Sequence, residues 1–560
     1  MAEIDNKLQS PDYTSPEQSG DFRLKEISIH SPSNDQAQLL DTPSVFVELD
    51  IYEDLFSNVI KGTYTFLDTQ GFAETIPIVG DETLIISFLT PGGEGTKPVT
   101  STLNFQQEEL QSRTASEEVV KQRFKVYDCV EIGMQERSKI YQLFFVSEEY
   151  LFSSKMKVSK GYRAPYSSIV KDVLKKINKN LRPDIAKKFY IEETATPQNV
   201  IIPNWEPFKA INFCASRSIS ADIEEQEQTD GQPNQSPKPL GSLFVFYEKL
   251  GTGFFYESIE SMIIKQKNIN QIPLFQYAPK LAGERSGNVG FGYSAVDKFE
   301  IKSSFKTLES LNSGMFGSKL IAYDPIRMKF DEIKFDYYQK KENVTEQKNE
   351  ETGVVTVTET AENLTDDSFR RFNDFIATDV SKIDNKQNKL ISSKSDFLGS
   401  NDAEIKLATT TRSHDSFFNP VKDTSNTNTT STTTKTATSI GVKSDTFRDG
   451  EAKPNNVEEW LLQRQTQLHE FGNIVVNFSV SGNSARHVGD LVRFEIPTTI
   501  QDDDPDLSSV NIGHQLYSGL YLISKIRHKI TRDSYDMDME LIKNSFAKRL
   551  PGQETEEKTE

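Results

Sequence analysis

Apolar and polar residues alternate along several short segments in the first quarter of the chain. In VFVELDI, residues 45–51, the apolar positions fall on one side of an extended strand and the acidic positions on the other. Strand patterns recur in four further segments: 62–67, 83–89, 124–130 and 141–146. Together they predict a compact β-domain, a barrel or a sandwich, over residues 21–160.

A helical period replaces this alternation after Pro165. Apolar residues between positions 169 and 181 fall on one helical face, and most lysines fall elsewhere. Pro165 suits the first turn of a helix, and Pro183 lies just beyond the last turn. The pattern therefore predicts a helix that begins after Pro165 and ends before Pro183.

The region that follows mixes helix and strand signals. A second helix is expected after Pro207, with its apolar side turned inward. Segments 243–247 and 254–256 are joined through Gly-Thr-Gly and predict a β-hairpin. Residues 161–340 are thus expected to form a mixed α/β middle domain.

Low-complexity sequence separates this middle domain from the last part of the chain. A Ser/Thr/Asn tract over 416–443 has too little apolar surface to offset the entropy of ordering it. We therefore expect residues 341–454 to be a partly flexible insertion. Residues 1–20 and 549–560 are expected to be a disordered arm and a disordered tail.

Strand patterns return after a helix predicted between Asn455 and Gly472. Val-Gly-Asp at 488–490 precedes an apolar strand, as Val-Gly-Asp does at 79–81, and LYLIS at 520–524 resembles LFFVS at 143–147. The matches come in the same order, so residues 455–548 are expected to form a helix plus a second β-domain related to the first. The predicted fold class is α+β, mainly β, with two β-domains flanking the mixed middle region.

Composition restricts the classes of protein that fit this pattern. A chain of 560 residues is long for one core and suggests about three to four domains. No apolar run approaches the about 20 residues that a bilayer requires, and the polar, acidic start does not resemble a signal peptide. Two cysteines cannot build a disulfide framework or a cysteine zinc site. We expect folding in a cytoplasm and no membrane insertion.

The charge balance argues against nucleic acid as a bound ligand. Lys and Arg number 64 against 83 Asp and Glu, which gives a net charge of −19. Tight binding to a phosphate backbone needs clustered positive charge that releases counterions. An acidic surface is compatible instead with DNA that passes without sticking.

Candidate chemistry along the chain is sparse. None of the six histidines pairs with another at helical metal-ligand spacing, and HExxH, GxSxG and P-loop motifs are absent from the sequence. Asp502, Asp503, Asp504 and Asp506 could offer oxygen ligands to calcium, but they do not match the EF-hand spacing and Pro505 interrupts them, so a solvated loop is favoured. We expect no cofactor, no metal and no enzymatic activity.

Three carboxylates share one face of a predicted strand near the end of the chain. Asp536, Asp538 and Glu540 alternate with Met537, Met539 and Leu541. Carboxylates that hydrolyse sugars must flank a cleft at a defined separation, so three in a row more simply form a solvated face. If this face lined a channel, it would repel phosphate.

Several segments resemble the baseplate hub proteins of T-even-type myophages, which join the tail tube to the central spike. The segments that carry this resemblance are YEDLFSNVIKGT (52–63), IPIVGDETL (76–84), PNWEPFKAIN (203–212), FVFYE (244–248), SGMF (313–316) and SGLYLI (518–523) with Arg527 and His528. Each is weak alone, and their order along the chain carries the specificity.

The resemblance implies a structural virion protein with two tube-type β-barrels per chain. A homotrimer would then present six similar barrels and match a hexameric tail tube to a trimeric spike. The implied partners are the tail tube ring, the central spike protein and the baseplate wedge proteins, with DNA passing through the bore. The implied location is the baseplate of the phage tail, assembled in the host cytoplasm.

The residues expected to contribute to the tube wall and its subunit contacts are Tyr52, Leu55, Phe56, Val59, Gly62, Gly80, Asp81, Gly489, Asp490, Gly519 and Tyr521, and the candidate acidic channel face is Asp536, Asp538 and Glu540. Three alternatives stay open. A bacterial contractile injection machine could use the same hub, and neighbouring genes would distinguish it. A tail-associated cell-wall hydrolase would need a site with a raised carboxyl pKa. A sugar-binding adhesin would have only two tryptophans for stacking.

Overall fold

The chain is described here from a computed structural model. The described residues are 19–31, 38–40, 44–69, 71, 78, 80–90, 120–135, 138–180, 187–195, 197–221, 242–267, 272–277, 293–303, 309, 313, 317–324, 329–336, 345–348, 355–358, 405–409, 457–472, 474–496 and 517–543. The predicted arm up to residue 18, the Ser/Thr/Asn tract, the acidic loop at 502–506 and the predicted tail lie outside them.

The first block of strands forms an antiparallel sheet. Its members are β1 (Arg23–His30), β2 (Gln38–Leu39), β3 (Phe46–Asp54), β4 (Lys61–Asp68), β5 (Thr83–Leu89), β6 (Val120–Gln135) and β7 (Ser138–Ser147). They lie side by side in the order β2-β1-β5-β6-β7-β4-β3. All five strands predicted from the alternating pattern are confirmed.

The second block draws strands from two distant parts of the chain. Its members are β13 (Leu274–Tyr277), β14 (Ala295–Val296), β15 (Lys298–Ser303), β21 (Ile474–Ser481), β22 (Leu491–Glu495), β23 (Gly519–Thr531) and β24 (Tyr535–Lys543). Their order is β14-β13-β22-β23-β24-β21-β15. β13, β14 and β15 therefore hydrogen-bond within the second block, although their residues fall in the range predicted for the middle domain.

Five strands of each block share one topology. The order β5-β6-β7-β4-β3 in the first block matches β22-β23-β24-β21-β15 in the second, and every neighbouring pair is antiparallel. Equivalent strands also follow one another in the same order along the chain. We call these two five-strand units the first and second repeat.

The topology corrects one detail of the sequence comparison. LYLIS at 520–524 lies in β23, which corresponds to β6, whereas LFFVS at 143–147 lies in β7. The two pentapeptides resemble each other because both are buried strand segments, and such segments look alike whatever their place in a sheet. β6 and β23 instead share a bulge, between Val126 and Asp128 in β6 and between Ile523 and Lys525 in β23.

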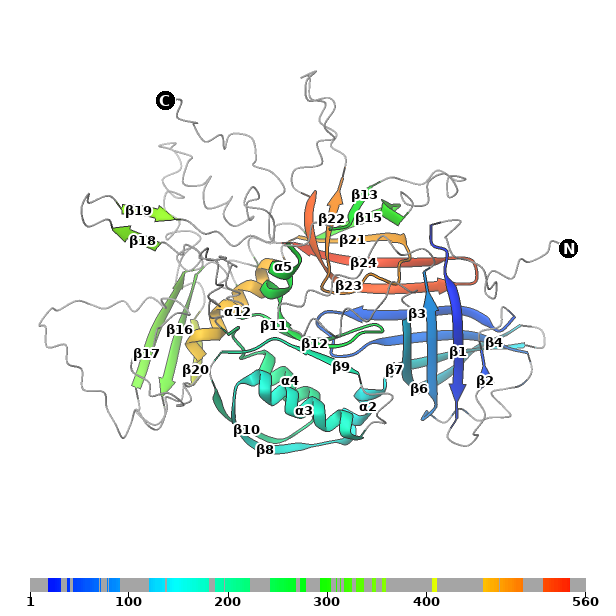
Figure 1. Ribbon diagram of the computed structural model, residues 1–560, viewed down its shortest axis with the longest axis horizontal. Coiled ribbons are helices and arrows are strands. Elements are labelled where there is room, and N and C mark those ends of the chain that lie inside the picture. The colour runs from blue at the N-terminus through cyan, green and yellow to red at the C-terminus, as the bar shows by residue number, and fades with distance from the viewer. Residues whose placement is uncertain are drawn as a thin grey trace, which may run out of the picture.

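Pairing between β3 and β23 joins the two repeats into a single sheet of 14 strands. In Figure 1 the blue strands of the first repeat and the orange and red strands of the second therefore lie next to each other. The path of described strands is open, running from β2 to β14, and neither block closes into a barrel among them. The closed tube-type barrels implied by the resemblance are thus not seen in the described part of the chain.

Both repeats contribute to one apolar core. Its buried residues include Ile51, Tyr64 and Phe145 of the first repeat and Tyr521 and Met539 of the second. The core continues across the β3–β23 pair, because neighbouring strands present alternate side chains to the same side of the sheet.

The middle region covers the edge of this sheet with helices and short strands (Figure 1). Its members are α2 (Glu148–Lys155), β8 (Val158–Ala164), α3 (Tyr166–Asn180), β9 (Lys188–Ile191), β10 (Gln198–Trp205), α4 (Pro207–Ala215), β11 (Phe244–Lys249), β12 (Gly253–Ser258), α5 (Ile259–Lys267) and α12 (Val457–Phe471). α3, α4, α12 and the β11–β12 hairpin confirm the sequence predictions. α2 was not predicted, because its buried positions are Glu148, Glu149 and Ser153 instead of apolar residues.

A second apolar cluster holds the middle region together. It joins Ile169 and Val173 of α3 to Phe208 and Cys214 of α4 and to Phe246 of β11. Cys214 is free and buried. None of the described helices is long and apolar enough to span a membrane.

Short strands extend the chain beyond the middle region. β16 (Gly317–Asp324) lies between β17 (Lys329–Asp336) and β20 (Ile405–Thr409), and β18 (Thr345–Lys348) pairs with β19 (Val355–Thr358). β20 comes from the predicted insertion and pairs in parallel with β16. Part of the insertion therefore belongs to a sheet.

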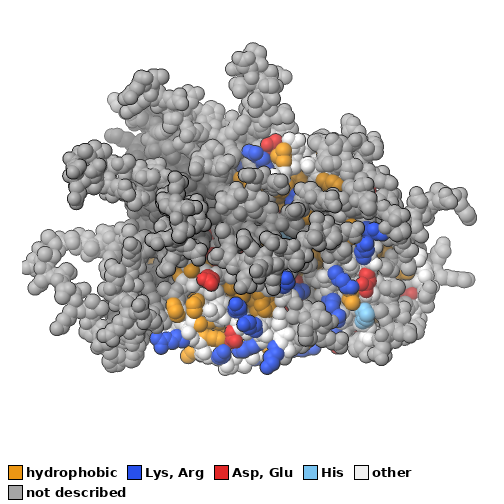
Figure 2. All heavy atoms as spheres, viewed as in Figure 1, with side chains coloured by type: hydrophobic (Ala, Val, Ile, Leu, Met, Phe, Trp, Pro, Cys, Tyr) orange, Lys and Arg blue, Asp and Glu red, His pale blue; other side chains and the backbone are white. Residues whose placement is uncertain are grey.

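Basic side chains gather on one part of the surface. Figure 2 shows Lys and Arg along the lower edge of the molecule, where Figure 1 places β8, β10 and α3. Lys160, Lys171, Lys175 and Lys179 are exposed there. The net negative charge is therefore not spread evenly over the molecule.

Gly62 provides a direct test of packing between β4 and its neighbours. A Cβ at this position would lie 2.2 Å from Cζ of Phe145 and 2.4 Å from the backbone oxygen of Asp50. We expect Gly62→Ala to lower the free energy of unfolding by about 3 kcal/mol, because backbone cannot move aside as a flexible side chain can. Urea denaturation followed by circular dichroism would measure the change.

Gly161→Ala is the matched control, since Gly161 also lies in a strand and nothing lies within 4 Å of an added Cβ. Its effect should stay within about 0.5 kcal/mol. Equal losses in both variants would contradict the packing seen at Gly62.

Candidate functional site

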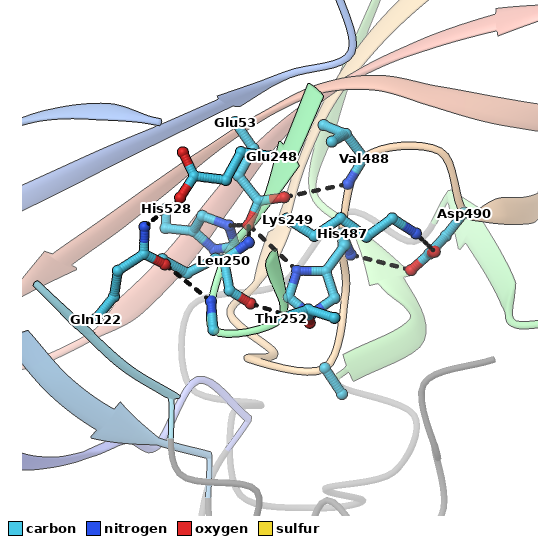
Figure 3. Close-up of polar contacts among 12 residues, drawn as sticks. Glu53, Gln122, Glu248, Lys249, Leu250, Thr252, His487, Val488, Asp490 and His528 are labelled. Atoms are coloured by element: carbon cyan, nitrogen blue, oxygen red, sulfur yellow. Dashed lines mark hydrogen bonds and ion pairs between the residues drawn. The ribbon is translucent and has the colours of Figure 1, made fainter. Parts of the chain in front are cut away.

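A group of buried polar side chains lies where the two repeats meet the β11–β12 hairpin. We call it the polar junction, and it consists of Glu53, Gln122, Glu248, Lys249, His487, Asp490 and His528 (Figure 3). Glu53 comes from β3, His528 from β23, and His487 and Asp490 from the loop before β22. The turn of the hairpin reaches into the space between these elements, so one cluster holds three parts of the chain.

Glu53 lies at the centre of the polar junction, and its side chain is 0% exposed. Its Oε1 lies 3.2 Å from Nδ1 of His487 and 3.4 Å from Nε2 of His528, the latter within ion-pair range. The backbone N–H groups of Leu250 and Val488 each donate a hydrogen bond of 3.3 Å to its carboxylate. A single carboxylate thus contacts both repeats and the hairpin.

Opposing effects set the pKa of Glu53. Burial alone would raise it, because a carboxylate loses hydration in the protein interior. The positive charge and hydrogen bond of His487, followed by those of His528, outweigh burial and lower the pKa well below its ordinary value of 4.5. Glu53 is therefore ionised in the folded protein at neutral pH.

Glu248 forms the second centre of the polar junction, and its side chain is also 0% exposed. Its Oε1 accepts a hydrogen bond of 2.7 Å from Gln122 and an ion pair from Lys187. Its Oε2 accepts hydrogen bonds from Ser147 Oγ at 2.6 Å and from the Ile60 backbone at 3.0 Å. Glu248 thereby fixes the hairpin against β6, β7 and the start of β4.

Lys187 connects Glu248 to a further buried carboxylate on α2. Its Nζ lies 2.8 Å from Oε2 of Glu149. Burial would lower the pKa of Lys187, but the charges of Glu248 and Glu149 raise it above its ordinary value. Burial raises the pKa of Glu149, and the attraction of Lys187 offsets only part of this rise. One lysine thus pairs with two buried carboxylates and joins α2 to the hairpin.

Gly489 and Asp490, both predicted as interaction residues, belong to the loop that completes the polar junction. Gly489 has φ +82°, a conformation that glycine adopts without strain, and its N–H donates to the backbone oxygen of Ile523 at 2.9 Å. Asp490 accepts hydrogen bonds from Lys249 at 3.2 Å and from the His487 backbone at 3.0 Å. These two residues therefore hold a chain turn inside the molecule.

Their counterparts in the first repeat lie in a more open place. Gly80 also has a positive φ, +92°. The side chain of Asp81 is 62% exposed and lies 3.4 Å from Nζ of Lys125. The repeated Val-Gly-Asp motif thus makes a similar turn in both repeats, but only the second one is sealed by the hairpin.

The predicted acidic face of β24 forms part of a larger polar face of the sheet. Asp536, Asp538 and Glu540 do lie on one side of the strand, while Met537 and Met539 are buried on the other. Each has a cationic or hydroxyl partner. Glu540 lies 2.9 Å from Lys525, Asp538 lies 3.7 Å from Arg527 and accepts from Ser479, and Asp536 accepts from Ser534.

Charges alternate from strand to strand across this face. The carboxylates of β24 lie beside Lys525, Arg527 and Lys529 of β23, and these lie beside Glu48 and Asp50 of β3. Arg527 holds Asp50 through two hydrogen bonds of 3.0 Å, and Lys529 lies 3.0 Å from Glu48. With Asp54 opposite Lys525, this face of β24 and β3 carries six carboxylates around the three cations of β23, and Lys302 of β15 also pairs with Glu540. The face is therefore not uniformly acidic as the sequence alone suggested.

The other predicted interaction residues divide into exposed and buried positions. Tyr52 and Phe56 are 40% and 50% exposed, and the ring of Tyr52 lies 6.0 Å from the guanidinium of Arg527. The buried members are Leu55, Val59, Gly62 and Tyr521, and Gly519 begins β23 with φ +133°. The buried members serve the core, so only the exposed ones could contact a partner directly.

Sequence reasoning did not find the centre of the polar junction. Glu53 and His487 are 434 positions apart, so no local spacing brings them together. One local signal of a buried carboxylate was present in the sequence. Glu53 lies on the same side of β3 as Leu49 and Ile51, at a position where the alternation calls for an apolar residue. An acidic residue at an apolar position of a strand indicates a buried and paired carboxylate.

The chemistry of this arrangement is structural. Among the described residues, no group of three His, Cys, Asp or Glu side chains is placed to hold a metal ion. Glu53 and Glu248 are each held by backbone N–H groups and by the side chains around them. Such a network orients chain segments, and it leaves Glu53 and Glu248 no exposed atom with which to reach a substrate.

Comparisons with known proteins give matches in structure only. No family model matches the chain, and neither does any curated protein. The model is similar to a tail protein from Neisseria meningitidis MC58, with 8% identity, a TM-score of 0.41 and coverage of 93% of this chain and 96% of that chain.

Two further structures show a similar degree of likeness. A 43 kDa tail protein of prophage MuSo2 from Shewanella oneidensis has 9% identity, a TM-score of 0.39 and coverage of 93% and 98%. The E. coli c3393 protein, a component of the type VI secretion system, has 8% identity, a TM-score of 0.32 and coverage of 89% and 74%. All three TM-scores lie below 0.5, so these likenesses carry no functional inference.

Removing the charge of Glu53 should weaken the junction in a pH-dependent way. The folded pKa of Glu53 lies below 4.5, so this carboxylate adds stability above pH 4.5 that is lost as the pH falls below that value. We expect Glu53→Gln to lower the free energy of unfolding by about 3 kcal/mol at neutral pH, because two buried imidazoles lose their anionic partner. The variant should also lose less stability on acidification than the wild type does.

Urea denaturation at a series of pH values from neutral down to about 3 would measure both effects. Glu206→Gln is the control, since Glu206 is 48% exposed and its ion pair with Lys157 lies at the surface. A Glu53→Gln variant with the acid sensitivity of the wild type would argue against a charged Glu53.

Proposed function

We propose that this chain is a structural subunit of a contractile phage tail, the baseplate hub that joins the hexameric tail tube to the trimeric central spike. The observation that carries the proposal is the repeated five-strand topology, with the two repeats joined side by side through β3 and β23. In this reading each repeat serves as one tube-type barrel of a ring, although its closure would need contacts beyond the described strands.

The way the repeats are joined supports a ring. β3 is the outer strand of the first repeat, whereas β23 is an inner strand of the second, so the contact joins two strands that are not equivalent. Contacts of this head-to-tail kind generate closed rings when the rotation between units is suitable. Three copies with two repeats each would give six similar units around a threefold axis.

The polar face of the sheet suits the wall of a DNA channel. Its carboxylates outnumber its cations among β24, β23 and β3, and each cation there is held by neighbouring carboxylates. A negatively biased surface raises the electrostatic energy of a phosphate backbone nearby. DNA would therefore pass such a wall without specific binding.

The polar junction would keep the two repeats at one fixed angle. Its hydrogen bonds join Glu53 to His487 and Glu248 to Gln122, with the hairpin turn between them. Buried charged groups tolerate little change of geometry, because an unpaired charge in the interior is costly. A ring adaptor needs this rigidity, since a small error in angle accumulates around the circle.

The remaining surfaces are available for the other partners. We propose contacts with the tail tube ring and the central spike at the two rims, and with baseplate wedge proteins at the outside. The exposed lysines of α3 and the residues of the insertion would lie on this outer side. The complex would belong to the virion and would assemble in the host cytoplasm.

The proposal predicts the oligomeric state of the purified protein. We expect native mass measurement at micromolar concentration to give a trimer, and electron microscopy to show rings with six similar lobes and a central opening. A β-rich wall without unpaired edges requires neighbours on both sides of each repeat. A monomer or dimer at every concentration tested would contradict the hub function.

A further inference from the structure

We propose that the outer half of β6, residues 128–135, pairs in antiparallel fashion with β15 of a neighbouring copy. This contact would be the intermolecular counterpart of the β23–β3 pair inside the chain. The inference rests on the proposed ring and names the strands that close it. Its occupant is a second copy of this chain.

The β23–β3 pair supplies the template. The first part of β23 lies between β22 and β24, as in Leu522, which faces Leu491 on one side and Ile542 on the other. After the bulge at 523–525, β22 ends and β3 takes its place, from Lys525 opposite Asp54 onward. At the bulge, the N–H of Leu55 donates to the Ser524 backbone oxygen at 2.9 Å.

The first part of β6 has two neighbouring strands, as the first part of β23 does. After its bulge, β6 has no described strand in the place that β3 takes beside β23. Its first part lies between β5 and β7, and the last pair with β5 is Lys125 opposite Thr83. A bulge follows at 126–128, at the position equivalent to that in β23. Beyond it, residues 128–135 pair only with β7 among the described strands, and β15 likewise pairs only with β21.

The open half of β6 exposes apolar side chains. Val130, Ile132 and Met134 are 44%, 55% and 67% exposed. Ile530, the counterpart of Met134 in the second repeat, is 0% exposed because β3 packs beside it. An exposed strand edge with apolar residues is prone to pair with another chain unless it is protected.

The shared topology fixes the register of the proposed pair. Leu49 and Phe299 are equivalent, since each connects through the next two strands to matching residues, Leu143 and Met539. Within the chain, Leu49 lies opposite Ile530 and Ile51 lies opposite His528. Transferred to the contact between copies, Phe299 lies opposite Met134 and Ile301 lies opposite Glu131.

Charge distinguishes the two contacts from each other. Within the chain, the acidic edge of β3 meets the basic strand β23, as in the pair of Asp50 with Arg527. In the proposed contact β6 contributes Asp128 and Glu131, and β15 carries Lys298, Glu300 and Lys302 where β3 carries Glu48, Asp50 and Tyr52, so β15 is the less acidic edge. A β3 strand placed against β6 would bring carboxylates together, so β6 favours β15.

Cysteine cross-linking tests the register directly. In a Cys129→Ser background, Glu131→Cys combined with Ile301→Cys should give covalent dimers and trimers under mild oxidation. Each single cysteine variant should stay uncrosslinked under the same conditions. A native trimer without cross-links would overturn the β6–β15 contact and leave the hub function standing, whereas a monomeric wild type would overturn both.

A substitution at the exposed edge tests the energetics. We expect Met134→Lys to raise the concentration needed for half-assembly of the trimer at least about tenfold, because a lysine would have to be buried against Phe299 of the next copy. Ile201→Lys is the matched control, since Ile201 is 79% exposed on β10, which belongs to a different sheet. Its effect should stay below about twofold, and equal effects of the two variants would overturn the proposal.

Discussion

Hydrogen bonding between β3 and β23 is the constraint on which the rest of the structure depends. The two strands lie more than 450 residues apart in the sequence, and their pairing turns two separate sheets into one. Closing so long a loop costs entropy, which the continuous apolar core beneath the pair must offset. The described strands of the middle region and of the insertion pair in separate small sheets, so these parts of the chain are arranged around the 14-stranded sheet without adding strands to it.

The polar junction adds selectivity to this pairing. Glu53 lies opposite Ile526 in the β3–β23 register, so its carboxylate reaches His528 on the same strand and His487 in the adjacent loop. A shift of β3 by one residue would turn Glu53 to the other face of the sheet and leave both imidazoles without their anion. The same shift would turn Leu49 and Ile51 away from the core and Asp50 into it. The apolar pattern and the buried charges thus specify the register together.

Local features of the fold could be predicted from the sequence, and long-range features could not. The alternation that predicts β3 and the helical period that predicts α3 each involve residues only a few positions apart. Both patterns can therefore be read directly from the sequence. The repeat was also predicted, from a shared Val-Gly-Asp turn followed by a similar strand segment, although LYLIS was matched to the wrong strand. The polar junction was not predicted, because its residues meet only after folding. The described strands form an open sheet and not the expected closed barrels, because a sequence pattern predicts strands without giving their neighbours. Glu53 in an apolar phase was the one local sign of the site.

A duplicated chain that builds a ring needs two contacts that are similar in geometry and different in chemistry. The contact inside the chain forms during folding, at the high effective concentration that a tether provides. The proposed contact between copies forms later, so β6 must stay soluble until then, and Asp128 and Glu131 beside Val130 and Ile132 give its edge a charge that discourages pairing with its own kind. The less acidic edge of β15, compared with that of β3, then favours β15 as the partner of β6 and helps to keep the two contacts from exchanging partners. On this view the two repeats must differ for assembly to be defined. If they were identical, the contact inside the chain and the contact between copies could exchange, and copies could join into open assemblies of undefined length.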